Sequence, residues 1–305
     1  MKAFIVCVSA ALAVVTSGFV SAQSCRYTTP PKKMVKGEKA RQEGGYDIFL
    51  LIGQSNMAGR APMTGEDTTR IIPGVWLLNG DDVPEKAKNP LNRYSTVRKD
   101  RNKNVYSNQK INPGTAFGEI IAAETGRKVL LVVNAMGETT IEEWAKDAPL
   151  IKLSSSIGKD KLQLYSEAVR RCREAMKYGT LKGIIWHQGE GNATESGIKK
   201  YPAQLMNLVS NLRMDLDAPE VPFIAGEISY LRKGEWSAVF NEMLHTIPEF
   251  IYKSAWVSSE GLPTLDPLTS SKRKPDWTHF NREGQLELGK RYAEKALEMC
   301  YPDRK

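Results

Sequence analysis

The sequence is poor in the residues that build disulfide frameworks and metal sites. Its 305 residues include four cysteines and three histidines. Four cysteines are too few to hold a chain of this length together, and the length leaves room for a large hydrophobic core instead. The histidines, His187, His245 and His279, are far apart in the sequence, and a zinc site needs at least three protein ligands. The sequence therefore predicts neither a disulfide-rich scaffold nor a metal centre.

Blocks of like charge are also missing. Lysine and arginine number 43 and aspartate and glutamate 35, so the net charge is 43 − 35 = +8, but no block of five or more like charges occurs. Nucleic-acid-binding proteins usually gather positive charge into a stripe or a known motif. With 41% hydrophobic and 26% charged residues, the chain is too apolar to be disordered. We expect a globular protein without a nucleic-acid partner.

A long apolar stretch occurs at the beginning of the chain. The basic start Met1–Lys2 precedes the nearly all-apolar segment Ala3–Val15, and Val20–Ala22 offers the small residues of a cleavage site. This is the layout of a secretory signal peptide, whereas a membrane span needs about 20 apolar residues. We predict cleavage after Ala22, an exported (secreted or periplasmic) protein and no membrane span in the mature chain. The alternative is an uncleaved anchor.

Cleavage would leave three cysteines, Cys25, Cys172 and Cys300, and a charge of 42 − 35 = +7. Exported proteins can keep disulfides, and the two ends of a domain often lie close together. A Cys25–Cys300 bridge is therefore one hypothesis. Lipid attachment at Cys25 is less favoured, because the residues before it lack the small apolar pattern of lipoprotein signals. Cys172 falls in a helical pattern and is predicted to be a buried free thiol.

Beyond a polar N-terminal extension, residues 23–44, the chain alternates between short apolar runs and longer helical patterns in one domain, residues 45–305. Short runs rich in isoleucine, valine and leucine are typical of strands buried on both faces. The predicted strands are 47–52, 75–78, 128–133, 183–186, 223–228 and 255–258, and the predicted helices are 115–125, 161–177, 201–216, 237–247 and 281–299. This alternation predicts an α/β fold with a central parallel sheet between helical layers.

Ligands of such sheets bind beyond the carboxyl ends of the strands, so the turns after the strands are the places to search. The first turn, Gly53–Arg60, carries Ser55 directly after a predicted strand. A serine at a strand-to-helix turn can project its hydroxyl, but it needs a general base to become a nucleophile. The alternative is that Ser55 only caps the following helix.

A second segment offers such a base. Asp276 precedes His279 by three residues, just before the predicted last helix. A carboxylate that accepts from one imidazole nitrogen orients the other toward a serine, as in a Ser-His-Asp triad. The alternative is that Asp276 caps the helix that starts near Asn281 and that His279 is a surface residue.

Two further turns contain polar groups and glycines. Gly137 follows the strand 128–133 and could present a bare amide to an oxyanion. The turn after the strand 183–186 contains Gln188, Glu190 and Asn192. His187 and Glu190 are spaced like a metal-binding pair, but the sequence offers no third ligand beside them.

Together, the four segments resemble a known family. The order Gly-Gln-Ser-Asn-Met-Ala-Gly-Arg, Asn-x-x-Gly-x-Thr, Trp-x-Gln-Gly-Glu and Asp-x-x-His is similar to the SGNH (GDSL-type) hydrolases. Within them it looks like the carbohydrate esterase family 6 and sialate O-acetylesterase-like (acetylxylan esterase-like) branch. The resemblance covers nearly all of Tyr46–Tyr301. It implies a three-layer αβα, flavodoxin-like fold, with Ser55 as nucleophile, His279 as base and Asp276 as the residue that orients His279.

The same resemblance implies an oxyanion hole made by the amides of Ser55 and Gly137 and a polar side chain of the third block. Gln188 is the predicted third donor and Asn192 its competitor, because Gly191 occupies the position where the wider superfamily has an asparagine. In addition, Gln54, Arg60 and Glu190 would support the site, with Glu190 braced against Arg60.

The activity that this resemblance implies is serine esterase chemistry on carbohydrates. It would remove O-acetyl groups from acetylated xylan or sialic-acid-type glycans through an acetyl-enzyme, without a cofactor. The expected partner is thus an acetylated oligo- or polysaccharide, and the oligomeric state is left open. Two alternatives remain: a non-catalytic glycan-binding protein on an esterase scaffold, and a lipase or thioesterase of the same superfamily.

Overall fold

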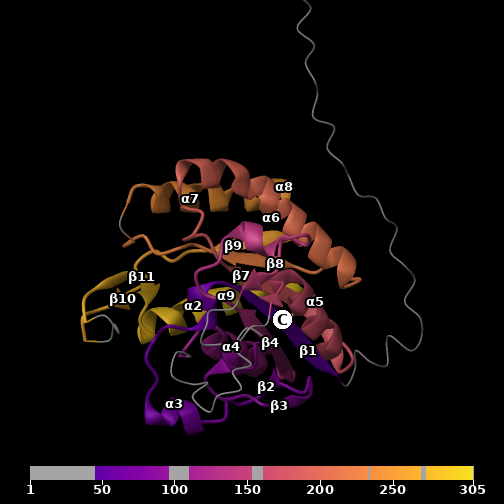
Figure 1. Ribbon diagram of the computed structural model, residues 1–305. Coiled ribbons are helices and arrows are strands. Elements are labelled where there is room, and N and C mark those ends of the chain that lie inside the picture. Colours follow the sequence, from indigo (N-terminus) through magenta and orange to yellow (C-terminus); the bar gives the residue numbers. More distant parts are fainter. Residues whose placement is uncertain (1–44, 96–109, 153–160, 233, 269–272, 305) are drawn as a thin grey trace, which may run out of the picture. The chain divides into compact units, whose positions relative to one another are not determined.

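A seven-stranded sheet forms the centre of the domain. The computed structural model describes residues 45–95, 110–152, 161–232, 234–268 and 273–304. The strand order is β3-β2-β4-β1-β7-β8-β9 (Figure 1). Neighbouring strands are parallel, except that β3 runs antiparallel to β2 at one edge. The strands are β1 (Tyr46–Gly53), β2 (Val75–Leu78), β3 (Pro84–Lys86), β4 (Val129–Ala135), β7 (Gly179–His187), β8 (Phe223–Gly226) and β9 (Ser254–Val257).

The order β4-β1-β7-β8-β9 is the 2-1-3-4-5 order of flavodoxin-like folds, with β2 and β3 added at the edge beyond β4. In this order the chain direction across the sheet reverses at β1. Gly53 at the end of β1 is level with Ala135 of β4 and with His187 of β7. The turns after these three strands therefore start side by side, at the place where such folds bind ligands.

Helices cover both faces of the sheet, because the side chains of each strand alternate between them. In β1, Ile48 and Leu50 pack on one face, whose core includes residues of α5 to α8, and Phe49 and Leu51 pack on the other, with α4 and α9. Figure 1 shows α6, α7 and α8 grouped on one side. The helices are α2 (Ser55–Ala58), α3 (Gly65–Thr69), α4 (Gly114–Thr125), α5 (Leu164–Ala175), α6 (Glu195–Asp215), α7 (Trp236–His245), α8 (Ile247–Phe250) and α9 (Arg282–Cys300), with 3-10 turns η1 (Leu91–Tyr94) and η3 (Ile141–Trp144).

This architecture confirms the predicted three-layer α/β fold, and it corrects several elements. The predicted helix 161–177 begins only at Leu164, because Lys161–Leu162 forms a short strand, β6, with β5 (Ile151–Lys152). The predicted helix 237–247 corresponds to α7, which ends at His245, and a separate short helix, α8, begins at Ile247. The segment Asp276–Phe280, for which no strand is predicted, forms the strand β11, paired with the two-residue β10 (Thr264–Leu265).

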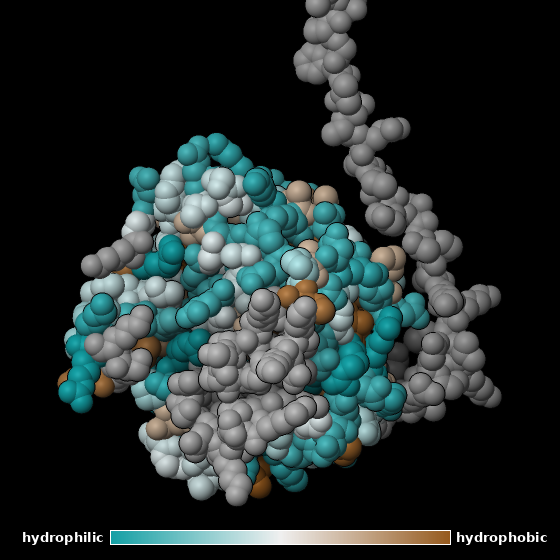
Figure 2. Space-filling model, in the orientation of Figure 1, coloured by the Kyte–Doolittle hydropathy of each residue, from teal (hydrophilic) through white to brown (hydrophobic). Residues whose placement is uncertain are grey.

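The described surface is mostly polar. Figure 2 shows a largely hydrophilic face on which hydrophobic residues are scattered. No helix in the described ranges is both long and apolar enough to cross a membrane. Cys172 is fully buried and free, as predicted, and burial raises the pKa of its thiol to about 12. Cys300 is also a free thiol in the described part of the chain. The predicted signal peptide, the predicted extension and Cys25 lie outside the described residues, so the Cys25–Cys300 bridge stays a prediction.

Candidate active site

The turn after β1 places Ser55 beyond the carboxyl end of this central strand. Gly53 has a φ of +133°, which favours glycine, and a side chain there would overlap the carbonyl of His187 on the neighbouring strand. The amide of Gln54 donates to that same carbonyl oxygen at 2.8 Å. Ser55 follows as the first residue of α2 and is 3% exposed. A backbone hydrogen bond of Gln54, the residue before Ser55, thus holds the turn against the sheet.

Ser55, His279 and Asp276 form a continuous chain of hydrogen bonds. The Nε2 atom of His279 lies 2.8 Å from the Ser55 hydroxyl oxygen. On the other side of the ring, Nδ1 of His279 lies 2.6 Å from Oδ2 of Asp276. The second carboxylate oxygen accepts from the amides of Thr278 and His279, at 3.1 and 3.3 Å. This is the arrangement that lets a serine lose its proton to an imidazole that a carboxylate orients.

These contacts also decide against the two helix-cap alternatives. Ser55 lies inside α2, whose capping position is taken by Gln54. The cap of α9 is Asn281, whose side-chain oxygen accepts from the amide of Gly284 at 2.9 Å. Asp276 is five residues before that cap and its carboxylate binds His279 instead. Both predicted alternatives are therefore wrong.

The electrostatics of Asp276 favour its charged form. Burial alone raises the pKa of this carboxyl group, but hydrogen bonds from His279 and from the amides of Thr278 and His279 outweigh burial and hold the pKa below its usual value. The side chains of Asp276 and His279 are 24% and 21% exposed. A negative carboxylate beside a partly accessible imidazole stabilises the imidazolium that forms when His279 takes a proton.

Gly137 lies against the nucleophile. The amide of Met136 donates to the carbonyl of Gly53 at 3.0 Å, which joins the turn after β4 to the turn after β1. A side chain at Gly137 would contact the Cβ atom of Ser55 and overlap the guanidinium of Arg60. Among the described residues, the amides of Ser55 and Gly137 have no hydrogen-bond acceptor. Amides without an acceptor next to a nucleophile are groups that can receive a developing oxyanion.

In the third block, the side chains of Gln188 and Asn192 are engaged in hydrogen bonds with other segments. Gln188 is fully buried, and its side-chain amide donates to the carbonyl of Thr139 at 3.0 Å and to Oδ1 of Asn192 at 2.8 Å. Its oxygen accepts from the Tyr201 hydroxyl at 2.8 Å. The competitor Asn192 donates to Glu142 at 2.9 Å. Both side chains fasten the turn after β4 to the turn after β7, which argues against Gln188 as the third donor.

The supporting residues also differ in part from the prediction. Glu190 does not brace Arg60: one of its carboxylate oxygens accepts from the side chain of Asn56 at 2.8 Å. Arg60 lies instead near Glu138 and Asp276. Burial lowers the pKa of Arg60, and the negative charges of Glu138 and Asp276 only partly oppose this effect. Gln54 is almost fully buried beneath the serine.

Asn56, whose part in the site was not predicted from the sequence, binds four groups of the site. The signal was present, since Asn56 directly follows the serine in the first block. Nothing in that block indicated which groups its side chain would meet.

His187 has a structural environment. Its ring is fully buried, and Nδ1 lies 3.0 Å from the hydroxyl of Tyr292, which in turn donates to the carbonyl of Trp186. Burial lowers the pKa of His187, and the charge of Glu190 only partly opposes this effect. Within the described ranges, no group of three or more histidine, cysteine, aspartate or glutamate side chains could hold a metal ion.

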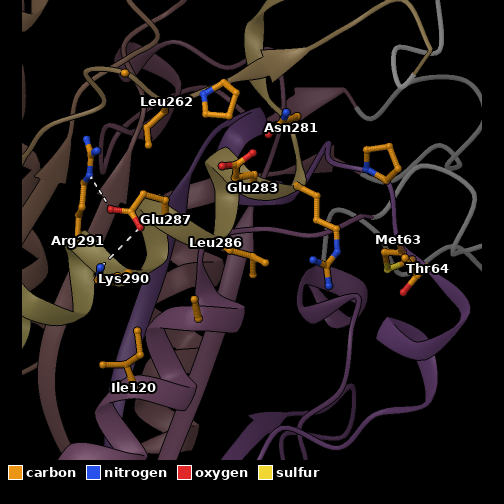
Figure 3. A pocket seen from close by; sticks show the side chains of 15 residues that line it. Met63, Thr64, Ile120, Leu262, Asn281, Glu283, Leu286, Glu287, Lys290 and Arg291 are labelled. Carbon is orange, nitrogen blue, oxygen red and sulfur yellow. Dashed lines mark hydrogen bonds and ion pairs between the residues drawn. The ribbon is translucent and has the colours of Figure 1, made fainter.

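A groove of about 880 Å³ lies between α4, the beginning of α9 and two loops (Figure 3). Ile120 and Leu286 contribute apolar side chains to it, and Glu287 pairs with Arg291 at 3.3 Å and with Lys290 at 3.9 Å. No triad residue lines this groove. Ser55, Asp276 and His279 therefore lie outside this groove, with Ser55 at the carboxyl end of β1.

Comparisons with known proteins agree with this fold. A protein of Arabidopsis thaliana, named as a probable carbohydrate esterase, is 27% identical over an alignment of 275 positions that covers 82% of this chain and 90% of that protein. Its crystal structure has a TM-score of 0.65 at 24% identity and matches 84% of this chain and 99% of that one. A carbohydrate acetylesterase of Xanthomonas citri has a TM-score of 0.58 at 18% identity, over 84% of this chain and 57% of that one.

A family model also matches most of the chain. The model of the family described as "Carbohydrate esterase, sialic acid-specific acetylesterase" matches residues 45–298, which include all four sequence blocks and the whole central sheet. The chain therefore belongs to this carbohydrate esterase family and is a carboxylic ester hydrolase.

Proposed function

We propose that the protein removes O-acetyl groups from carbohydrates, with Ser55, His279 and Asp276 as its catalytic triad. The observation that carries this proposal is the hydrogen-bond chain from Ser55 through His279 to Asp276, at 2.8 and 2.6 Å. The family to which the chain belongs supports an acetylated sugar as substrate. Acetylated sialic acids and acetylated xylan are the substrate classes to compare.

In the first half of the reaction, Ser55 Oγ attacks the acetyl carbonyl carbon while His279 Nε2 takes the serine proton. The carbonyl oxygen becomes negative and is met by the amides of Ser55 and Gly137. When the intermediate collapses, the bond to the sugar oxygen breaks, and His279 gives its proton to that oxygen. The products are a free sugar hydroxyl and an acetylated Ser55.

In the second half, water takes the place of the sugar. His279 removes a proton from the water as the water oxygen attacks the acetyl carbon. His279 then returns this proton to Ser55 Oγ as acetate leaves. Asp276 remains negative throughout and stabilises the charged imidazole. The guanidinium of Arg60, next to Gly137, adds positive charge on the side where the oxyanion forms.

The test is acetate release from a panel of acetylated glycans that contains O-acetylated sialosides and acetylated xylan. Wild-type protein should release acetate from at least one of them, and Ser55→Ala should lower kcat by on the order of 10⁶-fold. Labelling with a serine-reactive phosphonate, followed by peptide mass analysis, should place the adduct on Ser55. Equal acetate release by wild type and Ser55→Ala would exclude Ser55 as the nucleophile.

We also propose that the protein is exported and that its first 22 residues are removed. The short basic start, the apolar stretch and the small residues before Gln23 support this proposal. Mass analysis of the protein recovered from outside the cytoplasm should give a chain that begins at Gln23. A chain that still begins at Met1 would favour the uncleaved anchor.

A further inference from the structure

Asn56 is the residue after the nucleophile, and its side chain is fully buried. Its amide nitrogen donates to Glu190 at 2.8 Å and to the carbonyl of Thr278 at 3.1 Å. Its amide oxygen accepts from the amide of Phe280 at 3.2 Å and from the side chain of Gln285 at 3.1 Å. A carboxamide has two donor hydrogens and two acceptor lone pairs, so Asn56 uses its full hydrogen-bonding capacity.

The partners of Asn56 lie on either side of the general base. Thr278 and Phe280 are the two neighbours of His279 in β11, and Asn56 binds the backbone of both. Glu190 belongs to the turn after β7, and Gln285 to the first turns of α9. One side chain thus joins the helix that begins with Ser55 to three other segments of the site.

The position of β11 depends on such contacts, because β11 is outside the central sheet. It pairs with the two-residue strand β10, and their register is irregular. The backbone hydrogen bonds that fix Ser55 against His187 therefore do not fix His279. Asn56 supplies a direct link between the two segments, one residue from each reacting group.

We propose that Asn56 is a positioning residue, which holds β11 where His279 Nε2 can reach Ser55 Oγ. This inference rests on the proposed catalytic roles of Ser55 and His279. The four hydrogen bonds of Asn56 do not involve Ser55 Oγ or the ring of His279. The effect of Asn56 is on the position of His279 relative to Ser55. Displacement of a reacting group by about 1 Å can lower a rate by on the order of 10²-fold.

The test compares Asn56→Ala with Asn241→Ala. Asn241 is an equally buried asparagine on α7, whose side chain makes a matched pair of bonds with the backbone of Ile228, at 3.0 and 2.9 Å. Both variants lose buried hydrogen bonds, so both should have a lower Tm. We expect Asn56→Ala also to lower kcat by on the order of 10²-fold with little change in KM, while Asn241→Ala keeps the wild-type kcat.

A second pair of variants tests the bonds themselves and serves if Asn56→Ala does not fold. Asn56→Asp keeps the size of the side chain but places a carboxylate oxygen against Glu190 and the carbonyl of Thr278, so kcat should fall. Adding Glu190→Gln restores a donor between positions 56 and 190, and kcat should then recover in part. Recovery by exchange of donor and acceptor is not expected from a residue that only fills space.

The proposal is overturned if Asn56→Ala or Asn56→Asp keeps the wild-type kcat while its Tm falls like that of Asn241→Ala. It is equally overturned if the double variant is no more active than Asn56→Asp. Failure of the proposed function has a different signature, because wild-type protein would then release no acetate beyond the Ser55→Ala background.

Discussion

Two pairs of a carboxylate and a histidine occur in the described part of the protein, and only one of them belongs to the triad. Asp276 and His279 lie on β11, and Glu227 and His245 lie at the end of β8 and the end of α7. In both pairs a carboxylate oxygen contacts a ring nitrogen. The pairing alone therefore does not make a catalytic site.

The difference between the pairs lies in the position of the serine. In the triad, the Ser55 hydroxyl is on the imidazole nitrogen that faces away from the carboxylate. In the other pair, Ser258 donates directly to Glu227, at 2.9 Å, and no serine lies at hydrogen-bond distance from His245 in the described ranges. A hydroxyl that is bound to the carboxylate is a fixed donor, whereas one that is bound to the free imidazole nitrogen can be deprotonated.

The surroundings of the two pairs differ as well. Glu227 is 1% exposed and also accepts from the Tyr230 hydroxyl at 2.7 Å and from the amide of Ser259 at 2.8 Å. The ring of His245 stacks on Trp256, with centroids 3.8 Å apart. These contacts join α7 to the segment after β9. We infer that the Glu227 pair stabilises the fold, and that the Asp276 pair serves the reaction.

The largest expected effect comes from removing each histidine. His279→Ala removes the general base and should lower kcat by on the order of 10⁶-fold, as loss of a triad histidine does in serine proteases. His245→Ala removes a partner of a buried carboxylate and should lower Tm, with a kcat near that of the wild type. Acetate release and thermal unfolding of both variants check this contrast. Comparable losses of kcat in both would mean that the two pairs have related functions.

Replacing the two carboxylates, Asp276 and Glu227, should give the same contrast between lost activity and lost stability, with a smaller effect on kcat. Asp276→Asn keeps the shape of the site but loses the charge that supports the imidazolium, and kcat should fall by on the order of 10⁴-fold. Glu227→Gln replaces the charged acceptor of four hydrogen-bond partners with a weaker, neutral one. This change should lower the free energy of unfolding by about 1–3 kcal/mol. Steady-state kinetics and urea unfolding of both variants separate the two outcomes. The contrast fails if Glu227→Gln loses activity without losing stability.

The smallest effect concerns the pH dependence of stability. The pKa of Asp276 is lower in the folded protein than its usual value, because hydrogen bonds from His279 and two amides outweigh burial. Such a carboxylate stabilises the fold above its unfolded pKa of about 3.9, and this contribution is lost as the pH falls through the lower folded value. Asp276→Asn should therefore be less stable than the wild type at about pH 7, with the difference shrinking toward about pH 3. A difference in urea unfolding that stays constant over this range would contradict the assignment.

The sheet could be predicted from the sequence because its strands are buried on both faces. Runs such as those in β1 and β4 are continuous and apolar, a pattern that is typical of parallel strands covered by helices. The strand β3 escaped prediction because Pro84–Lys86 is short and polar and pairs only at the edge. The strand β11 escaped it because its partner β10 has two residues, a length that leaves no periodic pattern.

The contacts among Ser55, His279 and Asp276 could be predicted because each residue lies in a recognisable block. The hydrogen-bond partners of the other polar residues of the site could not be predicted. Gln188 has the right chemistry for an oxyanion donor, but its hydrogen-bond partners Thr139 and Tyr201 come from other segments. Likewise, Arg60 and Glu190 have opposite charges, so an ion pair between them is plausible from the sequence. In the structure, the side chain of Asn56 donates to Glu190 instead. Which polar groups meet depends on three-dimensional packing that a single sequence does not specify.

The central place of β1 has a consequence for biosynthesis. Tyr46–Gly53 is translated before either of its neighbours, β4 and β7, and it cannot be paired on both edges until residues up to His187 have left the ribosome. Until then it is an apolar strand with open edges, which is the kind of segment that aggregates or recruits chaperones. The strand that leads to Ser55, the proposed nucleophile, is therefore also a segment that needs protection while the chain is being made.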